Sequence, residues 1–367
     1  MDPRYAMIEE IREQPGLLQS IFERRAELTA PFVALMKKHP VRKVWFIGNG
    51  SPYYAGCTLR YAAEHMLHAE AEAVPAALFH HHGDFNVSGI YAPEDILLVC
   101  PAESGHSRGQ VDAARRAQSM GIRVMSTTLN PTGVLARSSD VVLPKPGEHE
   151  IAMAATKGQS MALYLILLCF IEGGRALGHL SEEEYRRYMT AMANVPENVR
   201  QTIRDTEDWF EKNEQRVMKA RTFFLLGYGA NYGTVQEAAL KFFECHQVPT
   251  WALELEESLH GPYRGLGKED MAFYLAAEAG PERDRMELLA GAARQFCRNQ
   301  VLIQSCHRGG EGDILPIHSG DVPYVNAIEY LIPLQTLSYL IAERMGIDLS
   351  IPLVSALDPV MIPGYED

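Results

Sequence analysis

Apolar and polar residues alternate in two different ways along this chain. Residues 5–38 place apolar and charged positions at helical spacing, which predicts an N-terminal helical arm over residues 1–38. Beyond residue 40, short β-rich apolar runs take turns with helical stretches. Four such runs fall at 41–48, 95–101, 122–127 and 140–144. Strands that alternate with helices of this length predict parallel βαβ units.

A long apolar helix is expected next, from about Met153 to Ile171, and a charged helical stretch, roughly 181–219, separates the first series from a second one. The second series is expected to hold strands at 221–229, 271–277 and 300–305 and helices at 233–246, 282–297 and 324–345. The pattern predicts an α/β fold of two lobes, each with three α/β/α layers around a parallel sheet, as in flavodoxin-like and Rossmann folds. We expect domains at 39–190 and 205–350 and a tail at 351–367.

The two series contain an internal repeat. FIGNGSPYYAG (46–56) aligns without a gap with LLGYGANYGTV (225–235). The identities pair Gly48 with Gly227, Gly50 with Gly229, and Tyr53 with Tyr232. Because the strand–turn–helix setting is the same in both, we expect a tandem duplication of one α/β lobe.

Length, charge and cysteine use narrow the class of protein. The 367 residues, 47% of them hydrophobic, suffice for two ordinary cores, and the formal net charge of -13 argues against a nucleic-acid partner. The longest apolar run, 161–171, is too short for a membrane span of about 20 residues and reads as a buried helix. The acidic N-terminus does not resemble a signal peptide, so we expect a cytoplasmic protein. Six cysteines without a CxxC pair argue against structural zinc and a disulfide framework.

Serine-rich turns follow two strands of the first series. Ser51 lies past the strand at 41–48, and Glu103, Ser104 and Ser107 lie past the strand at 95–101. Helix N-termini at the carboxyl ends of parallel strands bind anions, and serine hydroxyls could add donors. The alternative, that the serines only cap their helices, stays open. The Gly-x-Gly pair lacks the third glycine and the acidic strand end of a dinucleotide fingerprint.

The second series carries the strongest candidates for catalysis. Glu237, Lys241 and Glu244 share one helix face, at i, i+4 and i+7. A solvated surface bridge is the alternative, but apolar neighbours surround the three charges, and buried charges are retained chiefly in pairs or at sites. His260 follows in EESLHGPYRG, where a Gly-Pro turn would fix its loop for proton exchange.

Two other groups could carry chemistry but fit simpler interpretations. Cys245 adjoins this helix face, and we interpret it as a packing residue rather than a nucleophile. His80, His81 and His82 are consecutive and would point in different directions, which disfavours a metal site.

Together these residues resemble the sugar isomerase (SIS) family, in particular the two-lobe isomerase half of glucosamine-6-phosphate synthase and the ketosamine-6-phosphate deglycases. The resemblance spans nearly the whole chain and implies two tandem SIS domains. In the family pattern Glu237, Lys241, Glu244 and His260 are catalytic, while Ser51, Glu103, Ser104 and Ser107 bind the phosphate. HEIAMAATKG resembles the family motif E-x-x-V-A-S-T-K, which implies that Ala154, Thr156 and Lys157 also contact substrate.

Departures from the family pattern bear on the reaction. Ala102 and Ala155 stand where the family has serines. No glutaminase domain with its nucleophilic Cys precedes the arm, and residue 2 is Asp, so glutamine is not expected as the nitrogen source. The synthase has a lysine in its C-terminal tail that forms a Schiff base with the substrate. The equivalent position in this chain falls near Leu357, and the last lysine of the chain is Lys268, so that lysine is missing. This favours a deglycase, although deglycases usually lack a lysine at the position of Lys241.

The resemblance therefore implies cleavage of a 6-phosphorylated ketosamine, such as a fructosyl-amino acid 6-phosphate, to glucose 6-phosphate and an amine. The alternatives are a glucosamine-6-phosphate isomerase or deaminase and a non-catalytic sugar-phosphate sensor. No metal or organic cofactor is implied. The expected partners are a small sugar phosphate and further copies of the chain, in a homodimer or higher homo-oligomer with shared active sites. Neither nucleic acid nor a membrane is expected as a partner.

Overall fold

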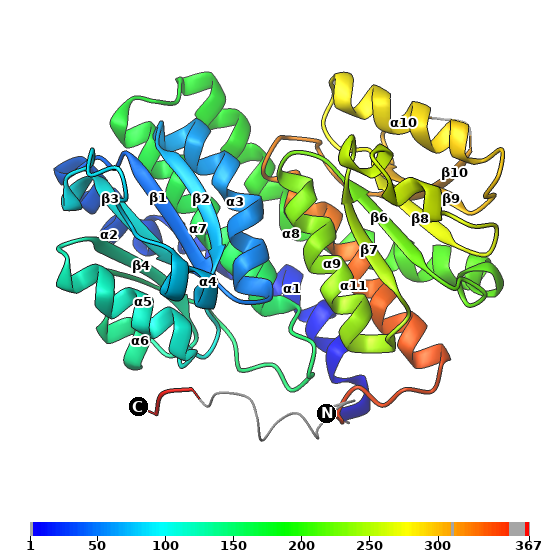
Figure 1. Cartoon of the computed structure of the whole chain (residues 1–367), viewed down its shortest axis with the longest axis horizontal. Helices are drawn as coiled ribbons and strands as arrows, with labels where there is room; N and C mark the ends of the chain where they lie inside the picture. Colours follow the sequence, from blue (N-terminus) through cyan, green and yellow to red (C-terminus); the bar gives the residue numbers. More distant parts are fainter. Residues whose placement is uncertain (1–2, 310–311, 352–363, 367) are drawn as a thin grey trace. The chain divides into compact units, whose positions relative to one another are not determined.

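The computed structural model describes residues 3–309, 312–351 and 364–366, and the chain divides into two compact units. We call them lobes (Figure 1). The first lobe contains Gly16–His149, Lys157–Ala193 and residues 364–366; the second contains residues 3–15, Glu150–Thr156 and 194–351. Two helices, α1 (Ala6–Glu23) and α8 (Glu182–Val217), run from one lobe into the other. The charged stretch expected near 181–219 is therefore one continuous helix.

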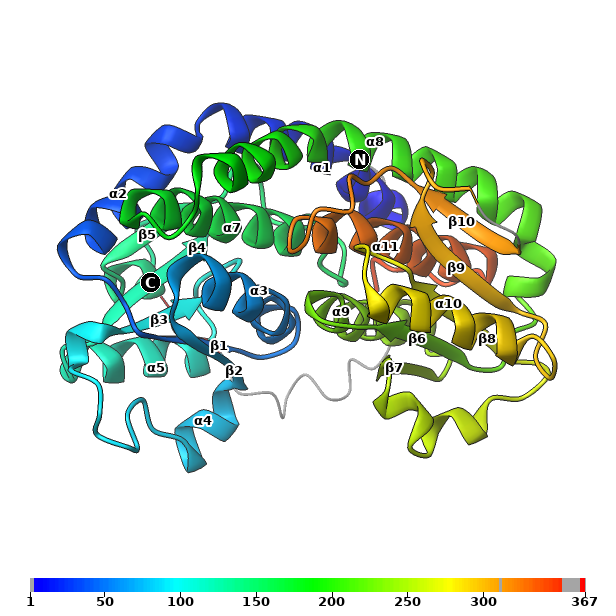
Figure 2. The ribbon, with the colours of Figure 1, turned by 90° about the horizontal axis from the view of Figure 1, so that it is seen from above.

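The first lobe is built on a parallel sheet of five strands in the order β2-β1-β3-β4-β5. The strands are β1 (Lys43–Gly48), β2 (Glu70–Pro75), β3 (Ile96–Cys100), β4 (Arg123–Thr128) and β5 (Val141–Pro144). One face is covered by α2 (Arg25–Lys38), α3 (Ser51–Leu67) and α7 (Lys157–Leu177), the other by α4 (Ala76–His82) and α5 (Arg108–Ser119), as Figure 2 shows. The short helix α6 (Val134–Arg137) contacts α5 and β4. Strand residues of β3 are buried throughout, because helices lie on both sides of them.

The second lobe repeats this topology, with a parallel sheet in the order β10-β9-β8-β6-β7. The strands are β6 (Phe223–Gly227), β7 (Thr250–Glu254), β8 (Met271–Leu275), β9 (Gln300–Ser305) and β10 (Asp313–Ile317). The helices α9 (Ala230–His246) and α11 (Asn326–Arg344) pack against each other, and α10 (Pro281–Ala293) packs on β8 and β9. Numbered within each lobe, both sheets read 2-1-3-4-5, the flavodoxin-like order. The predicted fold class is confirmed.

Several boundaries differ from those expected. The long apolar helix begins at Lys157 rather than Met153, and α9 begins at Ala230 rather than residue 233. The pattern also missed three strands, β2, β7 and β10, which all lie at the edges of their sheets.

The repeated glycines are explained by a close approach in each lobe. A Cβ on Gly48 would lie 2.4 Å from Cβ of Pro52, and a Cβ on Gly227 would lie 2.4 Å from the carbonyl oxygen of Asn231. In both lobes the strand end therefore touches the first turn of the following helix. The next glycine of each pair, Gly50 or Gly229, is the N-cap and has positive φ, 60° or 52°.

The apolar helix α7 is the core helix of the first lobe. By length and composition it is the one described helix that could cross a membrane, and 78% of its apolar window is buried inside the fold. All residues from Met161 to Ile171 are buried, and the helix packs against α2 and α3. This agrees with the interpretation of the run as a buried helix.

A buried carboxyl in α11 makes the stability of the second lobe depend on pH. Glu329 is 2% exposed and accepts hydrogen bonds from Ser319 Oγ at 2.5 Å and Asn198 Nδ2 at 2.6 Å. Burial raises the pKa of Glu329 from 4.5 to about 7, against the effect of both hydrogen bonds.

We expect Glu329 to lower the free energy of unfolding as pH rises. Between about pH 4.5 and 7 the unfolded chain loses the Glu329 proton while the folded chain keeps it, so the free energy of unfolding falls by up to roughly 3 kcal/mol. Glu329→Gln should flatten this dependence, as measured by urea unfolding at pH 5 and pH 8. An unchanged difference between the two pH values would contradict the assignment.

Candidate functional site

In the first lobe, one buried side chain ties together the two turns that carry the candidate phosphate ligands. Gln110 of α5 is 3% exposed, and its Nε2 donates to the carbonyl oxygens of Ile47, at 3.0 Å, and Pro101, at 2.6 Å. These carbonyls belong to the ends of β1 and β3. Gln110 therefore fixes the turn before Ser51 relative to the turn that holds Ser104. The sequence analysis missed it, because nothing in its helical context distinguishes it.

Two threonines at the end of β4 hold the second turn in place. Thr127 Oγ1 is 3.1 Å from both the amide nitrogen and the carbonyl oxygen of Ala102. Thr128 Oγ1 donates to the carbonyl of Glu103 at 3.1 Å. Gly105, with φ 75°, passes so close that a Cβ would lie 3.0 Å from Thr128 Oγ1. In the sequence, the polar residues at the end of the strand IRVMSTT could have indicated that its side chains hold this turn.

The serines of these turns do not act as side-chain caps of their helices. Ser107 occupies the N-cap of α5 but makes no capping hydrogen bond through its side chain. Ser51 is the first residue of α3, after the N-cap Gly50. Ser104 Oγ accepts from the amide of His106 at 3.3 Å, within the turn itself. The side chain of Glu103 is 27% exposed, with an oxygen 3.7 Å from His149 Nδ1.

The segment before α7 is tightly held in the second lobe. Thr156 is fully buried, and its amide and hydroxyl donate to Glu150 Oε2 at 2.6 and 3.1 Å. Its carbonyl accepts from Gln335 Nε2 at 3.1 Å. Ala154 is also fully buried, and Lys157, 4% exposed, is the first residue of α7 in the first lobe. The hydroxyl of Thr156 is thus engaged in holding the segment together.

In the second lobe, the three charged residues of α9 form one continuous contact. Lys241 Nζ lies 2.6 Å from Glu244 Oε2 and 3.5 Å from Glu237 Oε1. The side chains of Glu237 and Lys241 are each 1% exposed, whereas that of Glu244 is 32% exposed. This burial does not fit a solvated surface bridge. The contact therefore runs from the buried carboxylate of Glu237 through Lys241 to the carboxylate of Glu244, which is accessible to solvent.

The two carboxylates determine the charge state of the lysine. Burial by itself would lower the pKa of Lys241, but the nearby carboxylates of Glu237 and Glu244 outweigh burial, and the net pKa lies above its ordinary value. Lys241 is therefore a fixed cation near neutral pH. It can stabilise negative charge on a bound ligand, and it holds the Glu244 carboxylate in place.

The loop with His260 follows β7 and is fixed by local hydrogen bonds. Glu254 Oε2 accepts from the amides of Glu256 and Glu257, both at 2.9 Å. His260 is exposed at the end of the short helix Glu257–Leu259, and Gly261 after it has φ 138°. The histidine therefore lies on a rigid, solvent-facing turn, beside Glu256, whose pKa it helps to lower after the larger effect of Arg285.

The turn after the third strand of each lobe repeats a short motif. The sequence Ala102-Glu103-x-Gly105 after β3 recurs as Ala277-Glu278-x-Gly280 after β8, a further part of the repeat. In the second lobe, a Cβ on Gly229 would lie 4.0 Å from Glu278 Oε1, at the start of α9. A carboxylate of the protein thus stands near the N-terminus of α9.

The remaining candidates have structural roles or lie outside the described residues. Cys245 is fully buried, its Sγ is 3.6 Å from Met7 Sδ, and burial raises its pKa to about 12, which fits a packing residue. His80 and its two neighbours lie on α4. In the described parts of the chain, no group of three or more His, Cys, Asp or Glu side chains is arranged to hold a metal ion. Leu357 lies outside the described residues.

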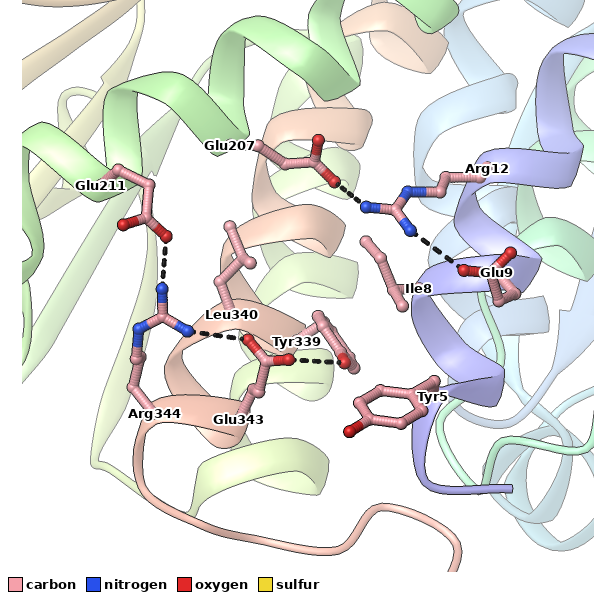
Figure 3. A pocket seen from close by; sticks show the side chains of 10 residues that line it. All are labelled: Tyr5, Ile8, Glu9, Arg12, Glu207, Glu211, Tyr339, Leu340, Glu343 and Arg344. Carbon is pink, nitrogen blue, oxygen red and sulfur yellow. Dashed lines mark hydrogen bonds and ion pairs between the residues drawn. The ribbon is translucent and has the colours of Figure 1, made fainter. Parts of the chain in front are cut away.

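A separate cavity of about 360 Å³ in the second lobe includes none of the predicted site residues. It lies between α1, α8 and α11 (Figure 3). Its two arginines already contact its carboxylates: Arg12 pairs with Glu9 and Glu207, and Arg344 with Glu211 and Glu343. Since these charges are paired with one another, we assign the cavity no part in catalysis.

Comparisons with known proteins agree with this architecture. No family model matches the chain. Glutamine–fructose-6-phosphate aminotransferase [isomerizing] of Clostridium perfringens is 25% identical over 363 residues, 94% of this chain and 57% of the relative. The enzyme of the same name from Pseudomonas aeruginosa is 28% identical over 366 residues, 95% of this chain and 57% of the relative. The chain thus spans somewhat more than half the length of these curated relatives.

Solved structures share the fold over nearly the whole chain. The C-terminal domain of glucosamine-fructose-6-phosphate aminotransferase from Francisella tularensis has a TM-score of 0.78 at 19% identity, covering 94% of this chain and 97% of that one. Glucosamine-6-phosphate deaminase from Thermotoga maritima has a TM-score of 0.73 at 24% identity, covering 95% and 97%.

The duplicated lobes form a two-lobe α/β fold that is shared with the C-terminal domain of glucosamine-fructose-6-phosphate aminotransferase from Francisella tularensis. The matches confirm the resemblance to the isomerase part of glutamine–fructose-6-phosphate aminotransferase.

Proposed function

We propose that the chain is a cytoplasmic sugar-phosphate enzyme that isomerises and cleaves a 6-phosphorylated ketosamine. The products are glucose 6-phosphate and a free amine. The observation that carries the proposal is the contact chain on α9, in which a buried lysine holds the partly exposed carboxylate of Glu244. A carboxylate held beside a fixed cation is suited to remove a proton from a carbon next to a carbonyl or imine.

The three serines and the predicted catalytic residues each have a role in this reaction. The turns with Ser51, Ser104 and Ser107 bind the phosphate through hydroxyls and helix N-terminal amides. Glu244 removes a proton from C1 and returns it to C2, so that the ketosamine becomes an imine at C1. Water hydrolyses this imine to the aldose phosphate and the amine.

Three further residues assist Glu244. Lys241 stabilises the negative charge that develops between C1 and C2, and Glu237 orients Lys241 from the core. His260 assists ring opening. Because His260 is exposed on its loop, we propose that it acts in the site of a neighbouring copy, in a homodimer with shared active sites. No metal or organic cofactor takes part in these steps.

The test is to incubate the pure protein with fructoselysine 6-phosphate and to follow glucose 6-phosphate by a coupled dehydrogenase assay. Turnover should occur, and Ser104→Ala or Ser107→Ala should raise KM about tenfold each, because a hydrogen bond to a charged group contributes roughly 1.5–3 kcal/mol. An absence of turnover across several ketosamine phosphates would refute the deglycase reading.

A parallel incubation with glucosamine 6-phosphate separates the alternatives. One protein of the same fold is a glucosamine-6-phosphate deaminase from Thermotoga maritima. Release of fructose 6-phosphate and ammonia would therefore replace the deglycase by an isomerase or deaminase. Tight binding of sugar phosphates without turnover of either compound would identify a sensor.

A further inference from the structure

A second group of reactive side chains lies at the far edge of the second-lobe sheet. β9 and β10 are parallel neighbours, with Ser305 opposite Ile317 (Figure 2). The residues that follow them, Cys306 and His318, therefore emerge side by side at the carboxyl ends of the strands. The amide of Cys306 donates to the carbonyl of Ile317 at 2.7 Å, which extends the pairing by one step.

Three side chains are aligned here as thiol, base and carboxylate. Cys306 Sγ lies 3.7 Å from His318 Nδ1, and His318 Nε2 lies 3.0 Å from Oδ2 of Asp205 in α8. The backbone of His318 is also held by α8, because its amide donates to Thr202 Oγ1 at 2.9 Å. His318 is thus held by two residues of α8, Thr202 and Asp205, and its Nδ1 faces Cys306, which follows the neighbouring strand β9.

The carboxylate fixes the tautomer of the imidazole. A carboxylate can only accept, so the proton between Asp205 and His318 resides on Nε2. Nδ1 is then an acceptor, and it faces the thiol. This is the arrangement by which a histidine serves as general base to a nucleophile.

The thiol is accessible and depends on that base. Cys306 is the one exposed thiol among the six cysteines, whereas Cys57 is half-buried and the others are buried. Partial burial, and secondarily the Asp205 carboxylate, raise the pKa of Cys306. Near neutral pH the sulfur therefore keeps its proton and becomes a good nucleophile when His318 removes it.

We propose that Cys306, His318 and Asp205 form a thiol-modification site that reacts with low-molecular-weight disulfides. Cys306 Sγ attacks one sulfur of the disulfide, and a new S–S bond forms as the old one breaks. The thiol proton passes to His318 Nδ1 and then to the departing thiolate, which leaves as a thiol. Cys306 is oxidised to a mixed disulfide, and the other half of the reagent is reduced.

The test uses the full chain and oxidised glutathione, with adduct formation followed by intact mass and peptide mapping. Cys306 should be modified first, and Cys306→Ser should remove that adduct. At pH 7, His318→Gln should slow modification of Cys306 about 100-fold or more, the low end of general-base effects. At pH 9.5 the two proteins should converge, because hydroxide then removes the proton directly.

Asp205 is a positioning residue, and its variant has a distinct signature. Asp205→Asn should slow the reaction at pH 7 but not at pH 9.5. The charged or titratable groups facing the imidazole are Asp205 from α8, Cys306 and the ring of His307, whose centroid lies 6.3 Å from that of His318. Cys57, in the first lobe, should react at the same rate in all variants and reports on folding.

Two outcomes would overturn the proposal. One is equal modification of Cys306 at pH 7 in the wild type and His318→Gln. The other is slower modification of Cys306 than of the half-buried Cys57 in the wild type. Neither depends on turnover of a sugar phosphate, so the site and the proposed enzyme activity can fail separately.

Discussion

Glu244→Gln should lower kcat by about 10²- to 10⁴-fold, the usual contribution of a positioned general acid–base. Glutamine keeps an oxygen for Lys241, whose Nζ lies 2.6 Å from Glu244 Oε2, and it nearly keeps the volume of the side chain. It cannot accept a proton from carbon. We therefore expect turnover of the ketosamine phosphate to be lost while its binding, measured by calorimetry, stays within about threefold.

Two variants separate catalysis from charge. Glu244→Asp retains a carboxylate but withdraws it from Lys241, and it should keep a small part of the activity. Glu197→Gln removes a carboxylate of an exposed i, i+3 bridge to Arg200 and should change nothing. If Glu244→Gln retained activity within threefold of the wild type, the base would have to be another group.

The central strands of both sheets could be predicted from sequence, while three of the four edge strands, β2, β7 and β10, could not. β3 and β8 lie between two neighbouring strands and under helices, so all their residues are buried and apolar. β2 reads EAEAVP and β10 reads DILPI, and neither is fully buried. An edge strand needs to satisfy only one neighbour, so its sequence carries a weaker apolar signal.

Side-chain contacts also divide into those that the sequence could predict and those that it could not. Glu237, Lys241 and Glu244 are linked by helical spacing alone, so their contact could be predicted from the sequence. Cys306 is 12 residues and Asp205 is 113 residues distant from His318 in the sequence. Both come close to it only through the pairing of β9 with β10 and the path of α8. No local pattern encodes such a meeting, because it depends on tertiary structure.

Lys241→Met should destabilise the second lobe by roughly 3–5 kcal/mol, the usual cost when one partner of a buried ion pair is removed. Methionine fills a similar volume but removes the cation opposite Glu237, whose side chain is 1% exposed. The free energy of unfolding can be followed by urea titration with Trp209 and Trp251 as fluorescent probes, in a Trp45→Phe background.

The double variant Glu237→Gln/Lys241→Met tests this reason directly. It replaces both charges by neutral side chains and should recover a large part of the lost stability, since the penalty comes from one uncompensated charge. Lys43→Met, in the first lobe and therefore followed by circular dichroism in both variants, is the matched control: Lys43 is 8% exposed, but its partners Glu70 and Glu72 are 68% and 52% exposed. Their carboxylates remain hydrated, so about 1 kcal/mol or less should be lost. Equal losses for Lys43→Met and Lys241→Met would show that burial of the carboxylate is not the cause.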